Sequence, residues 1–135
     1  CGGIAPSEPA LAEGAYLLPA VFDRAASGMR IVEEEIFGPV VAVIPFDTTE
    51  EAVALANASP YGLSGSIWTR DIARAVKVAK AVQTGVISVN CNNSVHIEAP
   101  FGGYKMSGLG RDLGLDAIRE YTEVKNVYVD LRDPE

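Results

Sequence analysis

The sequence has little of what builds disulfide-stapled secreted proteins or metal sites, with two cysteines, Cys1 and Cys91, and one histidine in 135 residues. No charged-then-apolar leader opens the chain, so a secreted disulfide scaffold is not indicated. No apolar run approaches the ~20 residues of a membrane span. No cluster of cysteine, histidine or carboxylates has the spacing of metal ligands. We therefore expect a cytoplasmic protein with no membrane span and no metal site.

Positive charge is also scarce, because 11 lysines and arginines face 18 aspartates and glutamates, for a net charge of −7. The basic residues are scattered along the chain, which argues against binding to nucleic acid or to an anionic membrane surface. A hydrophobic fraction of 48% with 21% charged residues is ordinary for a globular protein.

The chain opens with Cys1-Gly2-Gly3-Ile4 and not with methionine. This start indicates either processing or a piece of a longer protein, and composition does not choose between the two.

Apolar runs alternate with helical periodicity in the first two thirds of the chain. The spacing predicts strands at Val40–Phe46, Leu63–Thr69 and Val86–Asn90, and helices at Thr49–Asn57 and Asp71–Thr84. Thr48 stands three residues before Glu51, as in a capping box, and Gly85 suits a left-handed helix end. Strand, helix, strand, helix, strand predicts an α/β fold with a βαβαβ unit and a parallel or mostly parallel sheet.

The remaining third changes character. A glycine-rich loop runs from Cys91 to Gly114, and a loop of this length is usually functional. A short helix at Leu115–Tyr121 and an alternating strand at Thr122–Leu131 follow. That strand has no evident neighbour in the predicted sheet, so we expect it to pair with another chain.

Five ordered motifs resemble the C-terminal part of the aldehyde dehydrogenase superfamily, from Gly2 to about Tyr128. They are VFD at 21–23, EEIFGPV at 34–40, NASPYGLSGSIWT at 57–69, GVISVN at 85–90 and PFGGYKMSGLGRDLG at 100–114. The resemblance implies that residues 1–120 form the C-terminal part of the α/β catalytic domain. It also implies that residues 121–135 form an oligomerisation strand and tail.

The activity that the resemblance implies is oxidation of an aldehyde to a carboxylic acid with NAD or NADP. In this family a thiolate forms a hemithioacetal, hydride passes to the nicotinamide, and water activated by a glutamate hydrolyses the resulting thioester. The implied partners are a small-molecule aldehyde, the remainder of the parent enzyme, and further copies of the chain joined through Tyr121–Leu131.

Two residues are expected to bind the cofactor. By resemblance, Glu35 accepts hydrogen bonds from the hydroxyls of the nicotinamide ribose and Phe37 packs beside the same group. A carboxylate offers two acceptor oxygens to a diol and an aromatic ring offers an apolar wall. The alternative is that Glu33 to Glu35 form a solvated acidic turn and that Phe37 belongs to a core.

Three residues are expected to line the aldehyde tunnel, again by resemblance: Cys91, Val95 and Phe101. Val95 stands where many relatives have a larger aromatic side chain, which predicts a wider or differently shaped tunnel. His96 and Glu98 either contact a polar or cationic aldehyde or are simply solvated.

No catalytic residue is expected in this chain. Cys91 is assigned to the tunnel wall, and Cys1 lies in CGGIA and not in the family's glycine-glutamine-x-cysteine turn. The glycines at 108, 110 and 114 do not match the dinucleotide fingerprint, because the last gap is one residue too long and no strand directly precedes them. The isolated chain is therefore expected to be inactive.

Two other interpretations remain open. One is that the chain is a non-enzymatic module that self-associates through its last strand. The other is that it is part of a relative that transfers the acyl group to CoA. The identity of the aldehyde, the choice of NAD or NADP, and dimer against tetramer are not determined by the sequence.

Overall fold

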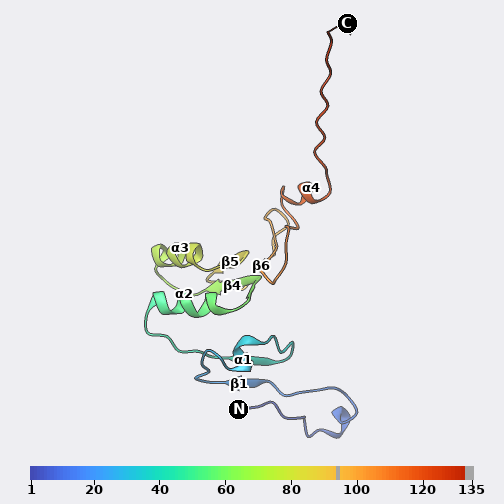
Figure 1. Ribbon diagram of the computed structural model, residues 1–135. Coiled ribbons are helices and arrows are strands. Elements are labelled where there is room, and N and C mark those ends of the chain that lie inside the picture. Colours follow the sequence, from blue (N-terminus) through green and yellow to red (C-terminus); the bar gives the residue numbers. More distant parts are fainter. Residues whose placement is uncertain (94, 133–135) are drawn as a thin grey trace. The chain divides into compact units, whose positions relative to one another are not determined.

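The computed structural model describes residues 1–93 and 95–132 (Figure 1). The chain divides into two compact units. The first comprises residues 1–60 and 76–83, and the second comprises residues 61–75 together with the chain from residue 84 onward. Each unit is described by itself.

The first unit contains a short parallel strand pair. Strand β1 (Ala20–Phe22) pairs with β2 (Val40–Ala42), with Ala20 opposite Val40. A 3₁₀ helix, η1 (Pro9–Leu11), precedes the pair, and helix α1 (Arg30–Glu33) lies in the connection between its two strands. The Val43 N–H still donates to the Phe22 carbonyl at 2.9 Å. The strand predicted over Val40–Phe46 is thus found, but it ends early.

Helix α2 (Thr49–Ala58) confirms the predicted helix and its start. Thr48 Oγ1 accepts a hydrogen bond from the Glu51 N–H at 3.1 Å, and Glu51 Oε2 accepts one from the Asp47 N–H at 2.8 Å. The first bond satisfies a donor that a helix leaves unpaired at its first turn, and the second holds the residue before the N-cap against the helix. The helix ends at Ala58, and the next residue, Ser59, is extended, as expected for a residue that precedes proline.

Helix α3 (Ile72–Ala81) is shorter than the prediction of Asp71–Thr84. At its start, Asp71 Oδ1 accepts from the Arg74 N–H at 3.0 Å. At its end, Asn57 Nδ2 donates to the Ala81 carbonyl at 2.9 Å, and Asn57 Oδ1 accepts from the Gln83 N–H at 2.7 Å. A side chain from α2 therefore caps α3 three residues before the predicted end.

The second unit contains a parallel pair joined by a helix. Strand β4 (Ser64–Ile67) pairs with β5 (Val86–Val89), with Ser64 opposite Val86 and Ile67 opposite Val89. Helix α3 connects them in sequence, so the predicted strand-helix-strand unit is confirmed here. Strand β2, by contrast, has β1 as its partner and not β4, so the three predicted strands do not form one continuous described sheet.

The break predicted at 59–63 contains a strand of its own. Strand β3 (Tyr61–Gly62) pairs antiparallel with β6 (Tyr104–Lys105), a partner more than forty residues away. Both strands are only two residues long and fall in segments rich in glycine and proline. No local periodicity marks them.

Gly85 has a different role from the one predicted. Its φ is not in the left-handed region, and it is not a helix end of that kind. Instead, a Cβ atom at Gly85 would overlap the carbonyl oxygen of Gly102. Glycine is needed here because two backbone segments cross in contact.

The last described residues form helix α4 (Ala117–Glu120) and an extended tail. Within residues 122–132 no strand pairing is found, and the apolar side chains predicted to share one face are exposed. They are Val127, Val129 and Leu131, exposed by 73%, 66% and 90%.

Few apolar residues are buried in the part of the chain that the structure describes. The buried ones are Ala20, Ala25 and Ala75, and no large side chain is fully buried. No helix among the described residues has the length and apolar character to cross a membrane.

Candidate functional site

The turn between α1 and β2 presents a carboxylate and an aromatic ring. Arg30 donates from Nε and Nη2 to the two carboxylate oxygens of Glu34, at 2.7 and 2.9 Å, and this hydrogen bonding lowers the pKa of Glu34. The carboxylate of Glu35 makes no hydrogen bond or ion pair with the residues that the structure describes. Glu35 is thus exposed, and its carboxylate is available to accept hydrogen bonds from a ligand.

Phe37 is held in an unusual way. The residue is 93% exposed and its backbone φ is +55°, a left-handed conformation that costs a non-glycine residue about 1 kcal/mol. The turn is anchored behind it, because Ala20 N–H donates to the Pro39 carbonyl at 2.8 Å. Within the described chain this backbone therefore presents Phe37 on the surface.

The loop after β5 begins at a double clamp. Asn90 adopts a left-handed φ of +55°, and its carboxamide bonds both backbone groups of Thr69. Ser88, which is buried, donates through Oγ to the Asn93 carbonyl at 2.8 Å. These bonds fix the strand end from which Cys91 projects as an exposed thiol.

The middle of this loop is exposed. Val95 is 54% exposed, and His96 and Glu98 are also on the surface. The backbone turns here through a hydrogen bond from the Ala99 N–H to the His96 carbonyl, at 3.1 Å.

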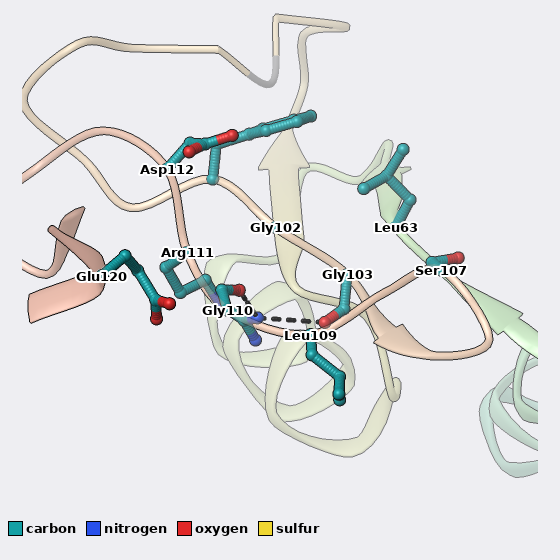
Figure 2. A pocket seen from close by; sticks show the side chains of 10 residues that line it. Leu63, Gly102, Gly103, Ser107, Leu109, Gly110, Arg111, Asp112 and Glu120 are labelled. Atoms are coloured by element: carbon teal, nitrogen blue, oxygen red, sulfur yellow. Dashed lines mark hydrogen bonds between the residues drawn. The ribbon is translucent and has the colours of Figure 1, made fainter.

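Phe101 is tied to the chain eleven residues later. Its N–H donates to the Asp112 carbonyl at 2.7 Å, and its own carbonyl accepts from the Asp112 N–H at 2.8 Å. The half-buried Phe101 borders a cavity of about 290 Å³, together with glycine backbone and the side chains of Leu63 and Leu109 (Figure 2).

Arg111 closes the glycine loop beside that cavity. Its Nη1 donates to the carbonyls of Gly103 at 3.0 Å and Gly110 at 2.6 Å, the two dashed bonds in Figure 2. Its guanidinium also lies 5.4 Å from the ring centre of Tyr104. Sequence reasoning missed this role, because carbonyl acceptors leave no residue pattern.

The predicted site residues fall into two groups. Glu35 and Phe37 lie in the first unit, two residues apart, whereas Cys91, Val95 and Phe101 lie in the second. The cavity is bordered by Phe101 but not by Cys91 or Val95. Across residues 1–93 and 95–132, no three histidine, cysteine or acidic side chains gather where they could hold a metal ion.

Known proteins similar to this chain are aldehyde dehydrogenases. The profile of the Aldehyde dehydrogenase family matches residues 1–127. Human Retinaldehyde dehydrogenase 3 is 44% identical over 98% of this chain and 25% of its own length. The 4-trimethylaminobutyraldehyde dehydrogenase A of Danio rerio is 46% identical over 100% of this chain and 27% of its own length.

Solved structures agree. Aldehyde dehydrogenase from Mycobacterium tuberculosis, complexed with NAD⁺, matches with a TM-score of 0.89 and 41% identity over 100% of this chain and 27% of its own. Betaine aldehyde dehydrogenase from Staphylococcus aureus, in complex with NAD⁺, gives 0.86 and 43%, covering 90% of this chain and 24% of its own. The chain spans about a quarter of the length of the curated relatives it matches. It belongs to the aldehyde dehydrogenase family.

Proposed function

We propose that this chain serves an NAD(P)-dependent aldehyde dehydrogenase that converts an aldehyde to a carboxylic acid. Residues 1–120 would be the C-terminal part of its catalytic domain, and residues 121–135 its oligomerisation strand and tail. The names of the relatives support this activity, since they include dehydrogenases of retinaldehyde, betaine aldehyde and 4-trimethylaminobutyraldehyde. The free, exposed thiols of Cys1 and Cys91 fit a reducing, cytoplasmic location.

The observation that carries the proposal is the pair Glu35 and Phe37. A carboxylate without a partner among the described residues stands two residues from an aromatic residue that is 93% exposed on a left-handed backbone. Strained, exposed residues of this kind cluster at ligand sites. A ribose diol fits the carboxylate, since Glu35 offers two acceptor oxygens and has no competing donor among the described residues.

The two residues would then divide the work at the cofactor. NAD or NADP, when bound, supplies the hydride acceptor. Glu35 orients the nicotinamide ribose through two charge-assisted hydrogen bonds, and Phe37 covers its apolar face and excludes water. Relatives solved with NAD⁺ support NAD as the first cofactor to test.

The aldehyde would approach along Cys91, Val95 and Phe101. The three side chains, a thiol, a short aliphatic group and an aromatic ring, would supply mostly apolar contacts to it. None of them is the nucleophile in this proposal. We therefore expect the 135-residue chain on its own to oxidise no aldehyde.

The cofactor role is tested in a chimeric enzyme, in which these 135 residues replace the matched segment of the S. aureus betaine aldehyde dehydrogenase. Glu35→Gln should raise KM for NAD⁺ by roughly tenfold or more, because a hydrogen bond to a charged group contributes about 1.5–3 kcal/mol. Glu33→Gln, at the exposed end of α1 two residues away, is the matched control and should leave KM unchanged. Equal KM values for the two variants would refute the role of Glu35.

We propose further that the enzyme is a homo-oligomer joined through Tyr121–Leu131. The extended tail leaves Val127, Tyr128 and Val129 exposed by 66–82%, as expected of a strand that pairs with another chain. Val127→Lys combined with Val129→Lys should shift the chimeric enzyme toward smaller species in sedimentation. A change of Val95, exposed elsewhere, to Lys should not. An unchanged sedimentation coefficient in the double variant would exclude this surface.

A further inference from the structure

The segment that carries Phe101 is held by residues far along the chain. Besides the two bonds between Phe101 and Asp112, the Gly114 N–H donates to the Ile97 carbonyl at 3.0 Å. Three backbone hydrogen bonds therefore join residues 97–101 to residues 112–114, and this short strip fixes the backbone on which the Phe101 ring is mounted.

Gly114 makes this contact possible. Its φ is +58°, and a Cβ atom there would lie 3.0 Å from Pro100 N and 3.1 Å from Ala99 C. Such contacts are tighter than side chains normally make, so the backbone at Ala99–Pro100 would have to give by a few tenths of an ångström. That backbone leads directly into Phe101.

The residues on the other side of the strip are also constrained by their backbone conformation and hydrogen bonds. Leu113 is also left-handed, with φ +64°, so Leu113 and Gly114 form a sharp turn of two consecutive residues. Arg111, just before the strip, is fixed by its bonds to the Gly103 and Gly110 carbonyls (Figure 2). We therefore expect a displacement at Gly114 to be passed toward Ala99–Pro100.

We propose that Gly114 is a positioning residue that sets where Phe101 stands and, through Phe101, the size of aldehyde that the tunnel accepts. The part that concerns Phe101 and the aldehyde rests on the proposed function. The part that concerns the strip rests on the contacts alone. Bulky aldehydes should depend on Gly114 more than small ones, because only a bulky group reaches the displaced wall.

Gly108 supplies a matched control. It is also left-handed, with φ +121°, but a Cβ atom there would have no neighbour within 4 Å. Gly108→Ala thus imposes backbone strain in the same loop without pushing on any other segment.

The first measurement is amide hydrogen exchange in the 135-residue chain. Gly114→Ala should speed exchange at the Phe101 and Asp112 amides by roughly tenfold, whereas Gly108→Ala should change them by less than about twofold. Equal effects of the two substitutions, or none at Gly114, would overturn the proposal.

Gly114→Asn guards against a variant that merely unfolds, because asparagine tolerates the left-handed region yet brings the same Cβ atom. It should also speed exchange at these two amides and leave β4 and β5 protected. Loss of protection throughout the unit in both Gly114 variants would show a general structural role and contradict local positioning.

The second measurement is steady-state kinetics of the chimeric enzyme. With Gly114→Ala, kcat/KM for phenylacetaldehyde should fall roughly three- to tenfold, while kcat/KM for acetaldehyde and KM for NAD⁺ stay within about twofold. A parallel fall for both aldehydes would refute the specificity role. If the chimeric enzyme without further substitutions is inactive, the proposed function fails. The amide hydrogen exchange result still decides whether Gly114 positions Phe101.

Discussion

The carboxamide of Asn90 replaces a strand partner for Thr69. Thr69 N–H donates to Asn90 Oδ1 at 2.8 Å, and Asn90 Nδ2 donates to the Thr69 carbonyl at 2.9 Å. The Asn90 N–H meanwhile donates to the Ile67 carbonyl at 2.8 Å. One side chain thus extends the pairing of β4 and β5 past the point where the strands end, and the loop that begins at Cys91 leaves from this clamp.

Asn90→Gly should open this clamp without straining the backbone. Glycine accepts the φ of +55°, so the substitution removes only the two side-chain bonds, each contributing about 1 kcal/mol. Exchange at the Thr69 amide should speed by roughly tenfold or more in the 135-residue chain. Asn92→Gly, on the exposed loop nearby, is the control. A Thr69 amide that stays protected in Asn90→Gly would contradict the clamp.

Gly85→Ala should disrupt the second unit. Its Cβ atom would overlap the Gly102 carbonyl oxygen, and a backbone atom cannot move aside as a flexible side chain does. We expect the free energy of unfolding to fall by several kcal/mol. The fall should be seen as faster hydrogen exchange at the Val86 amide, which donates to the Leu63 carbonyl at 3.1 Å.

Gly65→Ala is the comparison for that substitution. Its Cβ atom would lie 3.3 Å from Ile87 Cδ1, the mobile end of a side chain, so protection of β5 should change little. A similar loss in both variants would mean that the crossing at Gly85 has no special role.

Phe37→Gly should separate cofactor binding from stability. Removing an exposed ring sacrifices almost no packing and relieves the left-handed strain, so protection of the Ala20 amide should stay unchanged or rise. In the chimeric enzyme, KM for NAD⁺ should rise roughly tenfold because the apolar wall is lost. Arg24→Gly, with φ +53° and no proposed contact to cofactor, should leave KM unchanged. An unaltered KM in Phe37→Gly would remove Phe37 from the site.

The ion pair between Lys77 and Glu50 gives a prediction in pH. The hydrogen bond from Lys77 Nζ, at 2.9 Å, lowers the pKa of Glu50 below its ordinary value. The stabilisation is therefore present above the ordinary glutamate pKa and is lost as the pH falls through the lowered one. In an NMR titration of the chain, Lys77→Met should return the Glu50 pKa toward its ordinary value, and Lys80→Met should not. A titration of Glu50 that is the same in all three proteins would disprove the pairing.

Local patterns predicted local structure well. Thr48 and Glu51 cap α2 as their spacing suggested, and β5 lies where a β-branched run follows a glycine. The α/β class and the parallel pair of β4 and β5 are confirmed for the same reason, since short-range periodicity defines both strands and the helix between them.

Long-range backbone contacts were not predictable. The pairing of β3 with β6, the crossing at Gly85 and the bonds of Arg111 to carbonyls all join distant segments through backbone atoms, which carry no residue-specific signal. The end of α3 was misplaced because Asn57, a residue of another helix, caps it. Glu35 and Phe37 were singled out by family resemblance, and only the structure adds that one is uncommitted and the other strained.

The composition of the buried set has a thermodynamic consequence. Ala20, Ala25 and Ala75 are the buried apolar residues of the described chain, so its unfolding exposes little new hydrocarbon to water. Hydration of newly exposed apolar surface produces most of the heat capacity change of unfolding. For the 135 residues alone that change should be small for a chain of this length. The curve of stability against temperature should accordingly have little curvature, and calorimetry should show a small difference between the heat capacities of the folded and unfolded chain.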